Sequence, residues 1–591
     1  MLKQIRTIGT CLACLLLVIV LVACEKTPGK PSESGSQPQD LSVHKIVDGG
    51  KVQYRIVRPD KMSAQAREAS DSLYALLSSF TYAEVEYDTD LSPEYLKLGY
   101  HDPEAYEILV GNTNYSESAQ VISGLGYGDY AISTVGRKIV VAALTDRGLT
   151  DAVNVLNSIF RSAFSAAQGE LTVEAEELEK TATFNKMLED VPMLDGSVFD
   201  SGYDCGDGSY MIKLSDVSTA ELEQYLTKLR DMNYKEHAST VLAERNRFVT
   251  MLTENYILTV IHTDSDKLAR IIVDRSSLVS LPEYDKEYNE SDKICNSLLI
   301  QVGISPSDNE WQIGECYLIR CEDGRFIVYD GGYSGNESGV SPRNNAKNLY
   351  NTLVKYTPDG MKPTIAAWIF THAHGDHSGV ITDFAPAYSS YVDVDQFVYN
   401  FPSADQFESA DTYWGNRTKV ADAISKYYKS SDFVKAHPGQ RFRYANVELE
   451  ILYTLELYAP RSLTYFNTSS LVTRLFVNGQ SIMMPGDMST DSNKICREYY
   501  GDYLKSDFYQ VTHHGYSGGS TEFNKLCAPR WVLWPVGESD YKSLKAESRN
   551  SYLSSKEAAV ELFFPAFYNT TVIKLPFGGT SDDYEVYPNA S

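Results

Sequence analysis

Apolar runs typical of strands alternate with an amphipathic helical pattern in the first part of the chain. Residues 106–111, 130–132 and 138–141 have the run length and β-branched content of strands. Residues 151–164 repeat their apolar positions at helical spacing. This alternation predicts an α/β accessory domain over residues 42–172.

A second unit has one clear helix among strands. Ser218 followed by Glu221 forms a capping box, and apolar residues then recur at helical spacing as far as Met232. Strand-type runs lie on both sides of this helix. They predict a small α+β domain over residues 195–285, in which His262 lies in a strand pattern and is interpreted as a structural histidine.

From residue 297 the pattern changes to hairpins followed by αβ units. A helix with Ala346 and Leu349 on its apolar face precedes residues 364–370, a fully apolar run of the kind found in buried strands. A later hairpin turns at Asn478-Gly479, the favoured sequence for a two-residue turn. The predicted strands of this region are 315–321, 325–329, 364–370, 447–452, 470–476, 481–484 and 508–512.

Length and composition support several globular domains outside the first forty residues. The chain has 591 residues, and single cores usually stop growing at about 250–300 residues. Its 53 Lys and Arg against 79 Asp and Glu give a net charge of −26. Removal of Lys3 and Arg6 with a signal peptide would leave −28, which disfavours nucleic acid and anionic lipid as partners.

The N-terminus has the pattern of an export signal. Two positive charges precede the apolar run 15–22, which is too short to span a bilayer of about 30 Å as a stable helix. The run ends in Leu21-Val22-Ala23-Cys24, which resembles the lipobox of bacterial lipoproteins. The resemblance implies a signal peptide over 1–23, acylation of Cys24, and a mature protein anchored by lipid to the outer face of the membrane. Residues 24–41 then form a flexible tether; an uncleaved anchor helix is the alternative.

The motif at the end of the predicted buried strand is the most specific signal in the chain. His372, His374, Asp376 and His377 lie within six residues, on a turn that can direct alternate side chains into one cavity. Two imidazoles can bind one metal ion, while the aspartate and the third histidine suit a second ion nearby. The spacing therefore predicts a centre of two divalent metals, with zinc expected and manganese or iron as alternatives.

This H-x-H-x-D-H motif resembles that of the metallo-β-lactamase-fold hydrolase superfamily. The resemblance implies a C-terminal αββα sandwich over residues 290–585, preceded by the two smaller α/β and α+β domains. It further implies that Asp487, in Pro485-Gly486-Asp487, bridges both metals. The last ligand position falls at His513-His514, where we favour His514 as the ligand and His513 as the catalytic group.

The segments around these ligands are similar to ComEC-type exported hydrolase domains and to bacterial surface phosphorylcholine esterases. This branch usually lacks a third histidine on the first metal, and here the one candidate, His437, precedes Pro438-Gly439 and is interpreted as a turn residue. Water, substrate or Asn467 could complete that shell. The 42–172 pattern also resembles the non-catalytic N-terminal domain of α-glucuronidases, which implies a spacer or surface role.

The predicted reaction is hydrolysis of a phosphodiester. A bridging hydroxide would attack, with Asp376 orienting it, since two metals can lower the pKa of water from 15.7 toward about 7. The loop after His514 is expected to bind the phosphate of a small-molecule or surface-polymer substrate, through Gly515, Ser517, Gly519 and Ser520. The alternatives are a nuclease, a β-lactamase or lactonase, and a surface protein whose accessory domains contact glycan. The six cysteines beyond the tether leave disulfides open.

Overall fold

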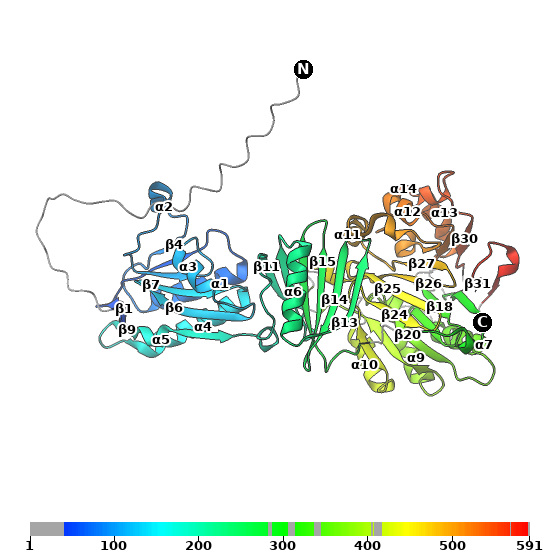
Figure 1. Cartoon of the computed structure of the whole chain (residues 1–591), viewed down its shortest axis with the longest axis horizontal. Helices are drawn as coiled ribbons and strands as arrows, with labels where there is room; N and C mark the ends of the chain where they lie inside the picture. Colours follow the sequence, from blue (N-terminus) through cyan, green and yellow to red (C-terminus); the bar gives the residue numbers. More distant parts are fainter. Residues whose placement is uncertain are drawn as a thin grey trace, which may run out of the picture.

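The computed structural model arranges the chain as three units along its longest axis (Figure 1). It describes residues 41–281, 287–304, 314–335, 344–403, 406, 417–567 and 569–588. The predicted signal peptide, Cys24 and nearly all of the tether lie outside these residues. Among the helices described, none combines the length and the apolar character needed to cross a bilayer.

The first unit is an α/β domain in three layers. Helices α1 (Ala64–Ser79) and α4 (Asp146–Ala163) cover one face of its larger sheet, and α3 (Ser116–Ile122) covers the other. The sheet extends past the predicted domain end at residue 172, because β10 (Lys180–Thr183) pairs with β6. The six-stranded order is β10, β6 (Asp129–Val135), β7 (Lys138–Ala143), β5 (Glu107–Val110), β3 (Arg55–Arg58), β4 (Tyr87–Thr89); the smaller sheet is β2 (Lys51–Val52), β1 (Val43–Asp48), β9 (Glu170–Glu174), β8 (Phe164–Ser165).

The second unit is an antiparallel sheet with one helix. α6 (Thr219–Asp231) begins at the predicted capping box of Ser218 and Glu221 and covers one face. The other face packs against the third unit through Phe248 and its neighbours. His262 is buried and its Nε2 lies 2.9 Å from the Val217 carbonyl, as a structural histidine would. The strand order is β11 (Val198–Asp204), β12 (Tyr210–Ser215), β16 (Leu268–Arg275), β15 (Tyr256–Thr263), β14 (Asn246–Leu252), β13 (Lys235–Leu242).

The third unit confirms the predicted αββα sandwich. A buried apolar cluster that includes Tyr317, Ile369, Leu475 and Trp531 lies between two mixed sheets. Helices α7 (Asn345–Tyr356), α9 (Ile381–Tyr388) and α10 (Arg417–Tyr427) cover the first sheet; α11 (Thr490–Tyr500), α12 (Thr521–Cys527) and α13 (Glu538–Ala546) cover the second. The first sheet is β23 (Asp432–Lys435), β22 (Gln396–Tyr399), β20 (Thr364–Ile369), β19 (Phe326–Asp330), β18 (Cys316–Arg320), β17 (Ser297–Gln301), β31 (Asn569–Leu575), β32 (Tyr584–Pro588), with β21 (Asp393–Val394) on β20. The second is β24 (Arg441–Tyr444), β25 (Val447–Tyr453), β26 (Val472–Val477), β27 (Gln480–Met484), β28 (Phe508–Gln510), β29 (Trp531–Trp534), β30 (Leu562–Pro565).

Parallel strands in both sheets determine where functional side chains gather. β20 lies parallel to β19 and β22, and β28 lies parallel to β27 and β29. The predicted Asn478-Gly479 turn joins β26 to β27, with φ of 49° and 78° as a type I′ turn requires. The segments that follow β20, β27 and β28 carry the predicted metal ligands.

The cysteines beyond the tether serve as packing residues. All six are free thiols, and all except Cys295 are buried. The disulfides that the sequence left open are therefore not formed among them. Burial also raises the pKa of the Cys496 thiol, in keeping with its apolar surroundings.

Candidate metal centre

The H-x-H-x-D-H motif leaves β20 as a loop and then begins a short helix. His372 and His374 lie in the loop, while Asp376 and His377 lie in the first turn of α8 (Gly375–Ser378). The side chains of His372 and His377 are fully buried. Asp376 is buried as well and His374 is half-buried, so the four ligand candidates lie in or near the protein interior.

Asp487 enters the same space from the second sheet. It follows β27 through Pro485 and Gly486, whose φ is +53°. A Cβ on Gly486 would lie 2.5 Å from the Ser470 hydroxyl oxygen, closer than any real Cβ contact. That hydroxyl accepts a hydrogen bond from the Asp487 N–H at 3.0 Å, so the glycine permits the approach that fixes the aspartate.

His513 and His514 both have left-handed backbone conformations, with φ of 47° and 52°. Such φ values are uncommon outside glycine and cost about 1–3 kcal/mol each. Hydrogen bonds hold the strained segment: the His513 N–H donates to the Gly486 carbonyl at 3.0 Å, and Trp534 Nε1 donates to the His514 carbonyl at 2.7 Å. His514 Nδ1 lies 2.9 Å from the Pro535 carbonyl, which leaves its Nε2 directed at Asp487.

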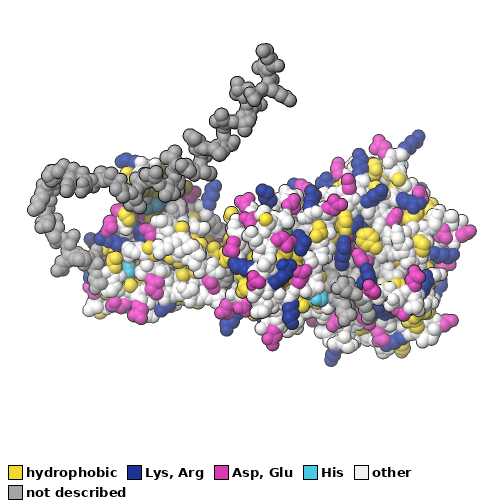
Figure 2. Space-filling view, in the orientation of Figure 1, with side chains coloured by type: hydrophobic (Ala, Val, Ile, Leu, Met, Phe, Trp, Pro, Cys, Tyr) yellow, Lys and Arg dark blue, Asp and Glu magenta, His cyan; other side chains and the backbone are white. Residues whose placement is uncertain are grey.

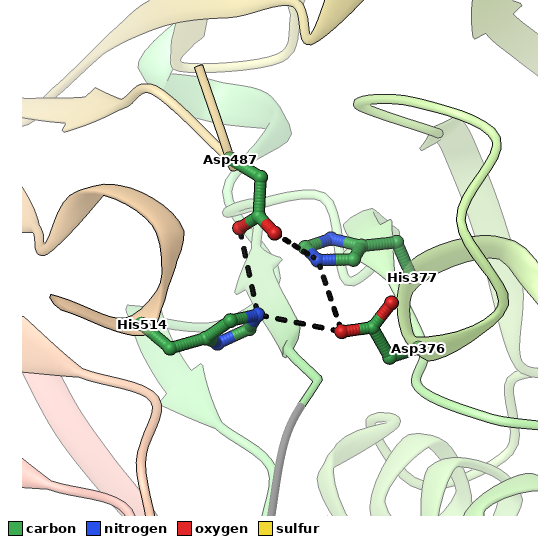
Figure 3. Close-up of side chains that lie close together, drawn as sticks. All are labelled: Asp376, His377, Asp487 and His514. Atoms are coloured by element: carbon green, nitrogen blue, oxygen red, sulfur yellow. Dashed lines mark ion pairs between the residues drawn. The ribbon is translucent and has the colours of Figure 1, made fainter. Parts of the chain in front are cut away.

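The ligand atoms form two groups that share Asp487 (Figure 3 shows the larger one). In the larger group, Nε2 of His377 and of His514 lie 3.2 Å and 3.4 Å from the two Asp487 oxygens, and Asp376 Oδ2 lies 3.5 Å from His514 Nε2. In the smaller group, His372 Nε2 lies 2.9 Å from His374 Nδ1 and 3.9 Å from Asp487 Oδ2. Within each group, all ligand atoms are within 4.8 Å of one another.

The polar atoms at the centre of this cluster fit a metal. Nε2 of His377, Nε2 of His514 and Oδ1 of Asp487 are buried and lack a hydrogen-bond partner of good geometry. Buried polar atoms are rarely left in this state, because each such atom costs about 1–3 kcal/mol. Three of them pointing at one space indicate that a cation belongs there, and the imidazole and carboxylate set suits zinc, manganese or iron.

The carboxylates also alter the protonation of the histidines. Burial disfavours the charged form of His514, but the carboxylates of Asp487 and Asp376 together outweigh it and raise the pKa of His514 to about 10. The same opposition raises the pKa of His377 well above its usual range. An imidazole must release its proton to bind a metal, so loading the site releases protons and depends on pH.

Two further carboxylates stand behind His377 and were not predicted from the sequence. Asp330 Oδ2 accepts a hydrogen bond from His377 Nδ1 at 2.8 Å, and its carboxylate also accepts from the Thr371 N–H and hydroxyl. Such a bond fixes the ring orientation of a metal-binding histidine. Glu315 lies 3.8 Å from His377 Nδ1 and is fully buried, which raises its pKa well above the usual range. The one signal for them in the sequence is their position beside apolar runs: Glu315 directly precedes the run of β18, and Asp330 ends the run of β19.

The predicted catalytic and substrate residues lie around the ligands. His513 Nε2 is 3.5 Å from Asp487 Oδ2 and 3.5 Å from Asn467 Nδ2, and Ser517 Oγ is 2.5 Å from His513 Nδ1. The Gly519 N–H donates to the Ser517 carbonyl, and the Ser520 hydroxyl caps α12 by accepting from Phe523 N–H. Gly515 adopts a φ of +96° against Trp534. Since several of these groups already have partners, phosphate binding by this loop stays a prediction.

His437 is absent from the ligand cluster. Its Nε2 lies 3.0 Å from Asp274 of the second unit, and its Nδ1 lies 2.9 Å from Glu456. Lys435 pairs with the same Asp274 at 3.0 Å and with Asp207 at 2.7 Å. The predicted turn residue is therefore part of a buried ion cluster between two units.

No family model and no curated protein matches this chain. Among solved structures it is similar to the metallo-β-lactamase fold protein YhfI from Bacillus subtilis, at 13% identity over 46% of this chain and 96% of that chain, with a TM-score of 0.28. It is also similar to CmlA, a diiron β-hydroxylase from Streptomyces venezuelae, at 14% identity over 40% of this chain and 44% of that chain, with a TM-score of 0.25. A metallo-β-lactamase with a HARLDQ motif from Cronobacter sakazakii is 14% identical over 34% of this chain and 71% of that chain, with a TM-score of 0.21. Similarity at this level carries no argument about chemistry. The chemistry is inferred from the residues of this chain, which form a buried His/Asp cluster able to hold metal in an αββα sandwich.

Proposed function

We propose that the sandwich is a metallo-β-lactamase-fold hydrolase with two metal ions. The observation that carries this proposal is the position of Asp487, whose carboxylate belongs to both ligand groups. Asp376, His377 and His514 would hold one ion with it, and His372 and His374 would hold the other. A carboxylate common to two sites keeps two ions close enough to act on one substrate.

Bound metals would supply a water of lowered pKa and a Lewis acid for the substrate oxygen. The residues of the chain would orient this chemistry. Asp376 lies in the first turn of α8, 8% exposed, where its carboxylate can accept a hydrogen bond from the attacking water. Asp330 accepts a hydrogen bond from Nδ1 of His377 and thereby fixes the orientation of this ring, which keeps Nε2 directed into the site.

The substrate class that we propose is the phosphodiester. His513 is 27% exposed while the side chains of His372, His377 and His514 are fully buried, so it can meet a substrate without leaving the cluster. If the Ser517 hydroxyl donates to Nδ1, the neutral ring carries its proton on Nε2, which faces the site. Burial lowers the pKa of His513 and so favours this neutral form. An N–H in that position can donate a hydrogen bond that stabilises a phosphoryl oxygen or the departing oxygen of the leaving group.

The surface argues against a long polyanion as substrate. The net charge is −26, and on the face shown in Figure 2 acidic and basic side chains of the described residues are interspersed without a continuous basic stripe. Nucleic acid binding requires several clustered cations. A small or surface-attached phosphodiester therefore fits better than a nuclease substrate.

A substrate panel tests the proposed reaction. Purified protein loaded with zinc, manganese or iron(II) would be assayed on bis-p-nitrophenyl phosphate, p-nitrophenyl-phosphorylcholine, a chromogenic β-lactam and an aryl lactone. We expect hydrolysis of at least one phosphodiester, lost in the His513→Ala variant and absent after chelation. Turnover of the lactam or lactone alone would show that the centre acts on carbonyl substrates instead.

We also propose that the protein is exported and anchored by lipid on Cys24. The support is the Leu21-Val22-Ala23-Cys24 sequence at the end of a short apolar run. The Cys24→Ala variant should leave the membrane fraction or keep its signal, with unchanged specific activity of the hydrolase. A normally processed variant that stays with the membrane would contradict the anchor.

A further inference from the structure

A cavity of about 340 Å³ lies in the first unit, away from the metal centre. It opens between the start of β3, the segment before β4, helix α2 (Pro93–Leu98) and the loop that leads into β5. Figure 1 places these elements at the opposite end of the molecule from the strands that carry the metal ligands. Its volume is within the range of about 300–1,000 Å³ typical of small-molecule sites.

Aromatic rings form much of the cavity wall. His101 is stacked between Tyr95 and Tyr115, with centroid distances of 4.3 Å and 3.5 Å. Tyr54 and Tyr106 form a second pair, with their centroids 5.2 Å apart. Tyr95, His101, Tyr54 and Tyr106 all line the cavity. Ring packing of this kind gives the wall a fixed shape.

A buried ion network holds one cation at the same wall. Glu107 is 1% exposed and accepts from Arg55 Nε at 3.1 Å, from Lys138 Nζ at 2.6 Å and from the Tyr115 hydroxyl at 3.1 Å. Arg55 lines the cavity and is thereby fixed in place. A network in which every member has a partner is a rigid support for a binding site.

The mixture of donors and acceptors indicates the ligand class. Among the described residues that line the cavity, Arg55 is the one cation, while Glu84, Glu86 and Asp102 add carboxylates to Glu107. An anionic ligand would be repelled by this excess of negative charge. A cationic ligand uses only acceptors, so the Arg55 guanidinium in the wall would oppose it. The ring of Tyr106 is also already covered by a cation, because the guanidinium of Arg137 lies 5.1 Å over it. Hydroxyl groups both donate and accept, so they match the whole wall.

We propose that this cavity binds a neutral carbohydrate. The sugar hydroxyls would donate to the carboxylates of Glu86 and Asp102 and accept from Arg55, and the apolar face of a sugar ring would pack on Tyr100. Tyr100 is 60% exposed at the cavity and can accept such a contact without rearrangement. Binding there would keep the hydrolase unit near a glycan-bearing surface, independently of which bond the metal centre cleaves.

The test is glycan binding by the full-length protein. Immobilised neutral, amino and acidic saccharides would be probed with the wild type and with Glu86→Gln and Tyr100→Ala variants, and choline would be used as a cationic competitor. Each variant should lose about tenfold in affinity for the neutral saccharides it binds, since either change removes roughly one polar or ring contact. Tyr82→Ala is the matched control, because Tyr82 is a fully exposed tyrosine of the same unit outside the cavity.

Several outcomes would overturn the proposal. Absence of binding to any neutral saccharide, or equal binding by Tyr100→Ala, Glu86→Gln and Tyr82→Ala, would exclude a carbohydrate site in this cavity. Displacement by choline but not by free sugar would assign the cavity to a cation. Hydrolysis of a soluble phosphodiester should be the same in all three variants, which separates failure of this proposal from failure of the metal centre.

Discussion

Two buried clusters that contain histidine lie at strand ends of the sandwich, yet they have different chemistry. The candidate metal centre gathers where β20, β27 and β28 end, while the second cluster gathers around Lys435 at the end of β23 and His437 just after it. Each cluster holds buried imidazole within about hydrogen-bonding distance of carboxylates, the rings of His377 and His514 in the first and the single ring of His437 in the second. Burial and charge alone therefore do not identify a metal site.

The difference lies in how each ring uses its two nitrogens. Both nitrogens of His437 face carboxylates, Asp274 on one side and Glu456 on the other. In the candidate metal centre, one nitrogen of His377 and of His514 is fixed by Asp330 or by the Pro535 carbonyl. Nε2 of each ring lies 3.2 Å or 3.4 Å from the shared carboxylate of Asp487 but has no hydrogen bond of good geometry, so it stays open to a ligand. A ring anchored on one side and open on the other is arranged as a ligand, whereas a ring paired on both sides is a structural cation.

Removal of the shared carboxylate should have the largest effect. Asp487→Ala takes a ligand and a charge from both groups, so we expect both metals to be lost and phosphodiester hydrolysis to fall below detection. Metal analysis of the purified variant and circular dichroism would check that the sites are empty while the fold persists. Asp491→Ala, a change of an exposed aspartate in the next helix, should keep both metals. Two metal equivalents and parental turnover in Asp487→Ala would refute the shared-ligand assignment.

Loss of His513 should separate chemistry from metal binding. His513→Ala leaves the ligand groups complete, so it should retain two metal equivalents while kcat falls by about 10²–10⁴. Ser517→Ala should cause a smaller loss, since it removes only the group that fixes the His513 ring. The check is metal content together with kcat and KM. If His513→Ala loses a metal equivalent, His513 is a ligand.

A change in the second cluster should affect stability and leave the metals in place. Asp274→Ala would leave Lys435 and His437 as buried cations without one of their partners, which costs about 3–5 kcal/mol. The thermal midpoint of unfolding should fall, while the metal content stays at two equivalents. Unchanged stability would show that the ion cluster does not join the two units.

The second cluster should also weaken at high pH. Burial lowers the pKa of His437, but Glu456 and Asp274 outweigh it and raise the pKa to about 9. A histidine whose pKa is higher in the folded state than in the unfolded state stabilises the fold. This contribution to the free energy of unfolding, on the order of 3 kcal/mol, is fully present below the unfolded pKa of about 6.5 and is lost as the pH rises through about 9. The difference in thermal midpoint between wild type and His437→Gln should therefore shrink between pH 7 and pH 10. A difference independent of pH would mean that His437 is neutral in the fold.

Local signals in the sequence predicted much of the fold and of the site. The capping box at Ser218, the Asn478-Gly479 turn and the motif from His372 to His377 all act within a few residues, so a single sequence reveals them. Asp330 and Glu315 were missed because their role depends on β18, β19 and α8 meeting in space. One of the two partners of His437, Asp274, comes from another unit, which no spacing in the sequence could indicate. The end of the first unit was placed too early because β10 joins its sheet after a long connection.

The most direct test of the central claim is the metal stoichiometry of the wild-type protein, measured with phosphodiester hydrolysis before and after chelation. Our account predicts close to two metal equivalents per chain, loss of hydrolysis when they are removed, and recovery when they are restored. A purified, folded protein that binds at most one equivalent under saturating metal, or that hydrolyses the substrate equally well without metal, would contradict it.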